Sequence, residues 1–130
     1  MMDPFEPIIF LENNQRIRSL FDSFWGMESV VNPLVNFNSE EAFWKSLPGK
    51  GTLLIVDAHV LTGDVGEWIK KFEKMKPHYR NRIILVVETK EEREKMLAQG
   101  VSQVLRLPFQ WSQWLPVMKK MGFRWGLWSR

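Results

Sequence analysis

The sequence predicts one doubly wound α/β domain, in which helices cover both faces of a parallel sheet. Apolar segments of strand length alternate five times with amphipathic segments of helix length along the 130 residues. Two apolar segments, Thr52–Val56 and Ile83–Val87, show no polar alternation, which is typical of strands buried on both faces. The length fits a single hydrophobic core, so we expect one domain over residues 1–130.

The first strand is predicted over Pro7–Leu11, and the segment Glu12-Asn13-Asn14 after it is a typical helix cap. Apolar residues then recur at helical spacing, which predicts an amphipathic helix. They are Ile17, Leu20, Phe21 and Phe24. We expect this helix to end at Gly26, because glycine readily adopts the left-handed conformation found after helices.

The second strand is expected between Val30 and Phe37. Pro33 within it has no amide hydrogen to donate, so this strand should lie at an edge of the sheet. Asn38-Ser39-Glu40-Glu41 has the form of a capping box and predicts a short helix, which Pro48 ends.

The second half of the chain continues the same alternation. The strand Thr52–Val56 ends at Asp57, and the strand Ile83–Val87 is followed by a capping box over Thr89–Glu92. A fifth strand is expected from Val101 to Leu107. The predicted helices lie around Trp68, Ile69, Phe72 and Met75, between Thr89 and Gly100, and from Ser112 to Met121.

This alternation predicts the flavodoxin-like strand order 2-1-3-4-5. The order places the second strand at an edge, in agreement with Pro33. Ligand sites of such sheets lie outside the carboxyl ends of the strands where the order reverses, here between strands 1 and 3. We therefore expect Glu12, Asn13 and Asp57 to cluster in one crevice.

The composition is that of an ordinary globular protein, with 45% hydrophobic and 25% charged residues. No apolar run approaches the roughly 18 residues that cross a bilayer, and the first residues do not resemble a signal peptide. We therefore expect a cytoplasmic protein without membrane contact. The absence of cysteine excludes disulfides and cysteine nucleophiles, and the two histidines, His59 and His78, lack the spacing of metal ligands.

The charge is unevenly distributed, although the net charge is only +3. No Asp or Glu follows Glu94, whereas six basic residues lie between Lys95 and Arg130. Such a segment suits an acidic partner or nucleic acid. No nucleic-acid motif accompanies it, and a solvated helix face explains scattered charges at least as well, so we do not expect nucleic acid to be the main partner.

Several short motifs resemble the receiver domain of bacterial response regulators, the CheY-like domain. They are the acidic Glu12 after the first strand, Leu54-Ile55-Val56-Asp57, Asp64-Val65-Gly66, Ala98-Gln99-Gly100-Val101 and Leu107-Pro108-Phe109. The similarity covers the chain from Pro7 to about Met121. It implies a domain of two-component signal transduction rather than an enzyme, with a histidine kinase as a partner.

By this resemblance Asp57 is the phosphoacceptor, and Glu12 and Asp57 are the residues that would bind Mg²⁺. Asn13 and Thr89 would line the same crevice. In the family a carboxylate attacks the phosphoryl group, while the metal ion, a lysine and a hydroxyl stabilise the negative charge of the product.

The chain departs from the family pattern at four places. Asn13 is neutral where the family has a second acid, and Leu107 stands where the family has the lysine. Thr89 matches the family's hydroxyl only if the end of the fourth strand is shifted, and the preceding Glu88 would repel phosphate. Val104 is small where the family often has an aromatic switch residue. We therefore expect a degenerate pseudo-receiver that acts through protein–protein interaction.

The alternative is a working phosphoacceptor in a phosphorelay, in which Glu12, Asp57 and the carbonyl of His59 still bind Mg²⁺. The resemblance also implies a cis peptide bond between Leu107 and Pro108.

The last residues, 122–130, form an aromatic and basic tail. Trp125 and Trp128 lie beyond the expected end of the last helix, and tryptophan is enriched at interface hot spots. We expect this region to bind a protein partner or to form a homodimer. The alternative is that the tail folds back onto its own domain.

Overall fold

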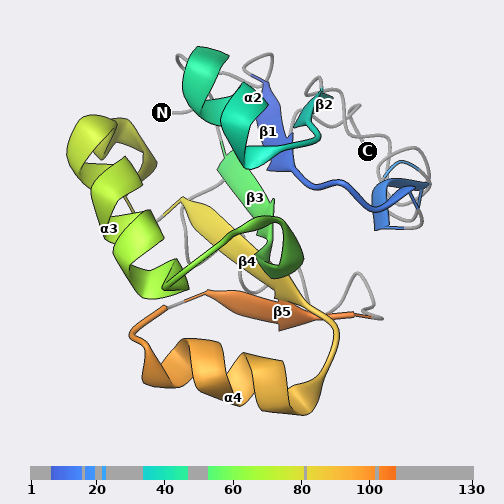
Figure 1. Ribbon diagram of the computed structural model, residues 1–130, viewed down its shortest axis with the longest axis vertical. Helices are drawn as coiled ribbons and strands as arrows, with labels where there is room; N and C mark the ends of the chain where they lie inside the picture. The colour runs from blue at the N-terminus through green and yellow to red at the C-terminus, as the bar shows by residue number, and fades with distance from the viewer. Residues whose placement is uncertain are drawn as a thin grey trace, which may run out of the picture.

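The computed structural model describes residues 7–15, 17–19, 22, 34–46, 53–80, 82–101 and 103–107. Its centre is a five-stranded sheet with the order β2-β1-β3-β4-β5, and every neighbouring pair is parallel (Figure 1). The strands are β1 (Ile8–Leu11), β2 (Leu34–Phe37), β3 (Leu53–Asp57), β4 (Ile83–Val87) and β5 (Val104–Arg106). The predicted fold class and strand order are confirmed.

The register of the sheet fixes which residues meet at its carboxyl edge. Leu11 in β1 pairs with Phe37 in β2 on one side and with Val56 in β3 on the other. The order of the strands reverses at β1, because β2 lies on one side of it and the later strands lie on the other. β2 lies at an edge, as Pro33 predicted, and its described part begins at Leu34.

Between β2 and β5 the described residues form three helices and two short 3₁₀ helices. They are α2 (Glu40–Ser46), η1 (Ala58–Val60), α3 (Val65–Met75), η2 (Pro77–Tyr79) and α4 (Lys90–Ala98). Residues 15, 17–19 and 22 are helical as well, in agreement with the predicted first helix.

One of the two predicted capping boxes is present in the structure, and the other helix is capped by the neighbouring residue. Thr89 caps α4 as predicted, and Glu92 completes a reciprocal box. The cap of α2 is Ser39 rather than Asn38, because the Ser39 hydroxyl accepts a hydrogen bond from the amide of Ala42 at 3.0 Å. The position three residues after that cap is therefore Ala42, which has no side chain to reach back to the cap.

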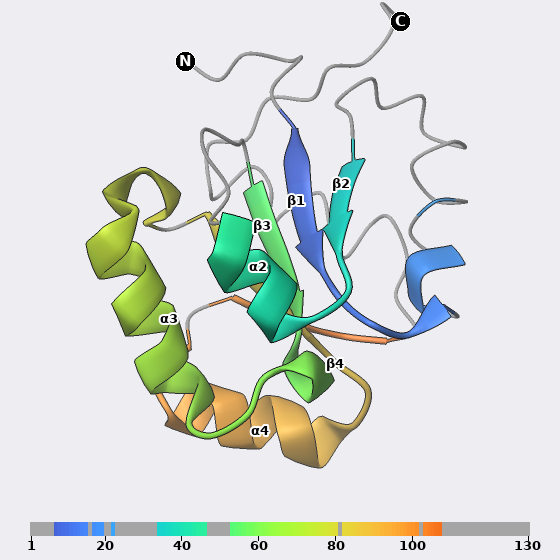
Figure 2. The same cartoon turned by 45° about the horizontal axis from the view of Figure 1, so that its top comes forward.

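Helices cover one face of the sheet as a common layer. Figure 2 shows α2 and α3 in front of the strands, and α4 lies along β5. The strand residues Ile9, Leu11, Leu54, Val56, Leu85 and Val87 form one core cluster with Phe43 of α2, Trp68 and Phe72 of α3, and Met96 of α4. The alternate strand residues Ile8, Phe10, Leu53, Ile55, Ile84 and Val86 are buried on the opposite face. Both faces are covered, as a doubly wound fold requires.

Several predictions lie outside the described residues. These are the end of the first helix at Gly26, the peptide bond between Leu107 and Pro108, the last helix, and the tail with Trp125 and Trp128. In the part of the chain that is described, no helix is both long and apolar enough to span a membrane.

Candidate functional site

Two buried carboxylates lie side by side where the strand order reverses. Glu12 follows Leu11 and Asp57 follows Val56, and those two residues are paired in the sheet. Parallel strands are about 4.8 Å apart, so the two backbones end as neighbours. Asp57 is only 1% exposed and Glu12 only 2% exposed. The predicted meeting of Glu12 and Asp57 at the carboxyl edge is therefore observed.

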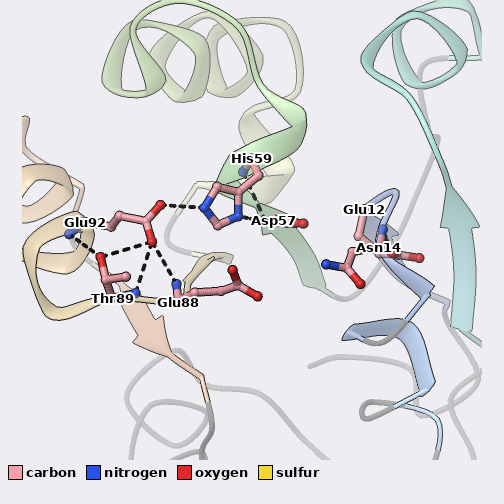
Figure 3. Close-up of polar contacts among 7 residues, drawn as sticks. All are labelled: Glu12, Asn14, Asp57, His59, Glu88, Thr89 and Glu92. Atoms are coloured by element: carbon pink, nitrogen blue, oxygen red, sulfur yellow. Dashed lines mark hydrogen bonds and ion pairs between the residues drawn. The ribbon is translucent and has the colours of Figure 1, made fainter.

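Asp57 caps the short helix η1 through one of its oxygens. Its Oδ1 accepts the backbone N–H of His59 at 3.0 Å and also lies 3.0 Å from the ring Nδ1 of His59 (Figure 3). Its Oδ2 is buried and has no hydrogen-bond partner among the described residues. Burial raises the pKa of Asp57, and the charge of Glu88 adds to this effect, while the contacts with His59 oppose it without cancelling it.

Glu12 is held by groups on the side of β1 away from Asp57. Its Oε2 accepts the amide of Asn14 at 2.6 Å, and its Oε1 accepts the side-chain amide of Asn36 in β2 at 2.9 Å. The same Asn36 nitrogen also donates to the carbonyl of Phe10 at 3.2 Å. Burial raises the pKa of Glu12 despite these hydrogen bonds, and the charge of Asp57 contributes to the rise. Both oxygens of Glu12 are therefore already engaged within the chain.

Asn13 lies on the same side of β1 as β2. It is exposed and lines a polar cavity of about 570 Å³ between the first helix and the end of β2. Gln15, Arg18, Asn36 and Asn38 are among the other residues that line this cavity. No described hydrogen bond joins Asn13 to Asp57, and the place of Asn13 in the predicted cluster stays a prediction.

The sequence indicated only the carbonyl of His59 for this site, and the structure brings its side chain into the site as well. Its Nε2 lies 2.5 Å from Oε2 of Glu92 in the first turn of α4, so the ring joins Asp57 to α4. Burial lowers the pKa of His59, but the hydrogen bond to Glu92 and the negative charges of Asp57 and Glu92 outweigh it and raise the pKa overall. Burial raises the pKa of Glu92, but its contacts with His59 and with the amide of Glu88 lower it overall.

Thr89 is engaged in capping rather than in the crevice. Its hydroxyl accepts the amide of Glu92 at 3.1 Å and lies 3.1 Å from Oε1 of Glu92, to which it donates. The amides of Thr89 and Glu88 donate to the same oxygen at 3.0 and 3.2 Å. Figure 3 shows Glu88 on the β4 side of Asp57. The hydroxyl of Thr89 already has two partners, so it is not free to bind a ligand.

The fifth strand brings no cation to this edge among the residues described. Leu107 is 8% exposed, and its amide donates to the carbonyl of Val87 at 2.8 Å, which fixes it beside the end of β4. Arg106 is exposed. Val104 is buried in the core cluster.

The carboxylate oxygens at this edge that could bind Mg²⁺ are partly engaged in hydrogen bonds within the chain. This ion requires near-ideal octahedral coordination by oxygen atoms. Both oxygens of Glu12 and one oxygen of Asp57 already accept hydrogen bonds, so the buried Oδ2 of Asp57 is the one carboxylate oxygen of this pair without a donor among the described residues. Within the same residues no three acidic or histidine side chains gather closely enough to hold a metal ion.

Solved structures share this fold. A bacteriophytochrome response regulator matches with a TM-score of 0.76 and 18% identity over 97% of this chain and 99% of its own. The receiver domain of a sensor histidine kinase from Pseudomonas aeruginosa, which has a magnesium ion coordinated in its active site cleft, matches with a TM-score of 0.66 and 15% identity over 90% of this chain and 98% of its own. A chemotaxis response regulator of Vibrio cholerae matches with a TM-score of 0.64 and 17% identity over the same shares.

No protein-family model matches the sequence, and no curated protein matches it. The chain has an aspartate at the switch point of a parallel sheet, where the neighbouring strands β1 and β3 end. Its fold is that of the CheY-like receiver domains of two-component response regulators, which confirms at the level of the fold the resemblance seen in the motifs.

Proposed function

We propose that this chain is a degenerate receiver domain, which works in signal transduction by binding a protein partner and not by accepting a phosphoryl group. The observation that carries the proposal is the occupation of the crevice by the chain's own contacts. The backbone N–H of His59 donates to one oxygen of Asp57. The side chain of Asn36 and the backbone amide of Asn14 each donate to one oxygen of Glu12.

The charge around Asp57 supports the same proposal. Phosphoryl transfer depends on positive groups that stabilise charge on the transferred oxygens. Glu12 and Glu88 add negative charge at Asp57, and the position of the family's lysine is occupied by the buried, apolar Leu107. A phosphoryl group would therefore enter a crevice where His59 is the cation in contact with Asp57.

The alternative is a working phosphoacceptor. The buried Oδ2 of Asp57, which lacks a donor within the described part of the chain, favours it, because that oxygen is free of competing hydrogen bonds. A structural neighbour that holds magnesium in its cleft also supports this alternative. Phosphorylation would then occur on Asp57 by a histidine kinase.

Intact-mass measurement separates the two functions. The chain is incubated with acetyl phosphate and Mg²⁺, and in parallel with beryllofluoride and Mg²⁺, beside an Asp57→Asn control. We expect the same mass for both proteins after acetyl phosphate, and no fluorescence change with beryllofluoride. A stoichiometric phosphoryl adduct on the unchanged chain that is absent from Asp57→Asn would refute the proposal of a degenerate receiver domain.

A second variant tests whether the missing positive charge at position 107 is the reason that Asp57 accepts no phosphoryl group. Leu107→Lys restores a cation at the place where the amide of residue 107 is fixed against Val87. If the missing positive charge is what prevents phosphorylation, Leu107→Lys gains a phosphoryl adduct that the unchanged chain lacks. If Leu107→Lys gains no adduct, the contacts of His59 and Glu12 are sufficient to prevent phosphorylation of Asp57.

The partner surface is part of the proposal. We assign it to the C-terminal region with Trp125 and Trp128, where a second copy of the chain or another signalling protein of the cytoplasm would bind. Light scattering on the full chain and on a chain truncated after Met121 tests this assignment. We expect the truncated chain to stay folded with a lower apparent mass than the full chain. A full chain that is monomeric at high concentration would exclude the homodimer.

A further inference from the structure

We infer that the cavity between α3 and the turn from α4 to β5 is a binding site for a small zwitterion, an α-amino acid with an apolar side chain. The cavity has a volume of about 290 Å³. It lies on another part of the sheet from Asp57, so the inference does not depend on whether Asp57 accepts a phosphoryl group.

The cavity is separate from the crevice at Asp57. Ile83, the first residue of β4, and Val101, which precedes β5, belong to its wall. Asp57 pairs with Val86, which follows Ile83 along β4. A strand advances about 3.3 Å per residue, so the backbones of Ile83 and Val86 are about 10 Å apart along the strand. The cavity therefore lies toward the amino end of β4, whereas the crevice lies at the carboxyl edge of the sheet.

One face of α3 forms a wall of this cavity. The lining residues of α3 are spaced at i, i+3, i+4 and i+7, so they lie on the same side of the helix. They are Gly66, Ile69, Lys70 and Glu73. Gly66 lets α3 approach the opposite wall closely, because a Cβ at this position would lie 2.9 Å from the carbonyl oxygen of Gln99 (Figure 1). The two walls are therefore in direct contact at one end of the cavity.

Three charged side chains line the cavity. Lys70 and Arg80 are exposed, and Glu73 is half-buried. No ion pair joins these three groups to one another in the described part of the chain. Two cations suit the carboxylate of an amino acid, and the carboxylate of Glu73 suits its ammonium group. A ligand with negative charge alone would be repelled by Glu73, so the charges favour a zwitterion.

The rest of the lining suits an apolar side chain. Ile83 and Val101 are each 6% exposed, and Ile69 is half-buried and packs against the core. Such a surface gains free energy when an aliphatic group covers it. The volume is at the lower end of the range for ligand sites, about 300–1,000 Å³, so a ligand of amino-acid size is appropriate.

Gln99 supplies a further polar group. Its Oε1 is buried and has no hydrogen-bond partner among the described residues, and such an acceptor is costly. The last torsion of a glutamine side chain is broad, so a rotation brings this oxygen toward the cavity that Gln99 lines. The ammonium group of the ligand would then supply the donor that Oε1 lacks.

A bound ligand would join two elements of the fold. It would contact α3 on one side and the turn from α4 to β5, which contains Gly100, on the other. α4 is anchored weakly, because Met96 is its buried residue. An amino acid in the cavity would therefore add a contact that holds the end of α4 against α3, and the domain would respond to the concentration of this ligand.

Isothermal titration calorimetry of the full chain with L-leucine tests the inference. We expect saturable binding with a dissociation constant of about 1 mM or below. Three analogues each lack one part of the ligand: isocaproate lacks the ammonium group, isoamylamine lacks the carboxylate, and glycine lacks the apolar side chain. Each should bind at least about tenfold more weakly. No binding of leucine up to about 10 mM, or binding of isocaproate as tight as that of leucine, overturns the inference.

Charge variants on α3 test the place of binding. Lys70→Gln and Glu73→Gln remove charges that line the cavity, and each should weaken leucine binding by about tenfold. Lys74→Gln and Glu67→Gln are the matched controls, because these residues belong to the same helix but do not line the cavity. Equal weakening in a variant and its control would show that general charge, and not the cavity, is responsible.

Two readouts separate binding from a structural effect of the variants. Glu73→Gln should narrow the preference for leucine over isocaproate, because it removes the group that attracts the ammonium and repels an anion. In NMR spectra of the unchanged chain, leucine should shift the amide signals of Lys70 and Gly100 and leave that of Asp57 in place. An unchanged preference, or shifts confined to the carboxyl edge of the sheet, contradicts the assignment to this cavity.

Discussion

Asp57→Asn should make the protein more stable at high pH. The substitution removes a charge from a side chain that is 1% exposed, while the new amide oxygen can still accept the backbone N–H of His59. Oδ2 of Asp57 has no hydrogen-bond partner among the described residues, and burying a charged group without a partner costs more than the roughly 1–3 kcal/mol of a neutral polar group, so a neutral amide in its place lowers this cost. We therefore expect the free energy of unfolding to rise by about 1–2 kcal/mol near pH 8.5.

The gain should shrink as the pH falls. The pKa of Asp57 is raised by burial, so its ionised form is disfavoured in the folded state, and this cost is present above the folded pKa and vanishes at low pH. The raised pKa of His59 acts in the same sense, because its charged ring stabilises ionised Asp57 at low pH and is lost as the pH rises. The loss of the charged His59 ring makes the difference between the two proteins larger near pH 8.5 than near pH 6.

Urea unfolding followed by tryptophan fluorescence measures this difference. With an m-value of about 1–3 kcal/mol/M, the expected gain moves the midpoint by roughly 0.3–2 M. Asp64→Asn is the matched control, because Asp64 is an exposed cap of α3 whose Oδ1 accepts the amide of Glu67, and asparagine caps helices about as well as aspartate. An Asp57→Asn protein that is less stable than the unchanged chain at pH 8.5 would mean that Asp57 is well solvated or well paired.

Substitutions at three further residues test the packing and the cap, each measured as the change in the free energy of unfolding. Phe43→Ala should lose about 3–5 kcal/mol, because Phe43 is fully buried among aromatic rings, and a loss below about 1 kcal/mol would contradict that packing. Gly66→Ala should lose about 1–3 kcal/mol, because its Cβ would lie 2.9 Å from the carbonyl oxygen of Gln99; an unchanged stability would show that α3 can shift freely. Thr89→Ala should lose about 1 kcal/mol and Thr89→Ser much less, whereas equal losses would point to the methyl group rather than the hydroxyl.

Much of the fold follows from local patterns in the sequence. β3 and β4 were predictable because continuous apolar runs are typical of strands whose side chains are buried on both faces of a sheet. Pro33 indicated the edge position of β2, because proline cannot donate to a second neighbouring strand. The cap of α4 was predictable from four consecutive residues. The cap of α2 was missed by one residue, because Asn38 and Ser39 are both good caps and the sequence alone does not decide between neighbours.

The contacts of the site were less predictable, because they depend on residues far apart in the chain. His59 and Glu92 are separated by 33 positions, and Glu12 and Asn36 by 24. The sequence indicated that Glu12 and Asp57 end neighbouring strands, but the direction of a side chain depends on the donors that the next strand offers. Here the side chain of Asn36 in β2 offers a hydrogen-bond donor, so the carboxylate of Glu12 points toward β2. The short spacing between Asp57 and His59 was the one local signal for the ring contact.

The weak anchoring of α4 gives the molecule a part that can open by itself. A helix with one buried side chain has a local opening free energy well below that of the sheet, whose strands β3 and β4 are buried along their whole length. Backbone amides of α4 should therefore exchange with deuterium sooner than those of β3 and β4. Partial opening of this kind exposes new surface without global unfolding, so the helix can be remodelled by a binding partner, and its outward residues can change during evolution, at little cost to the rest of the domain.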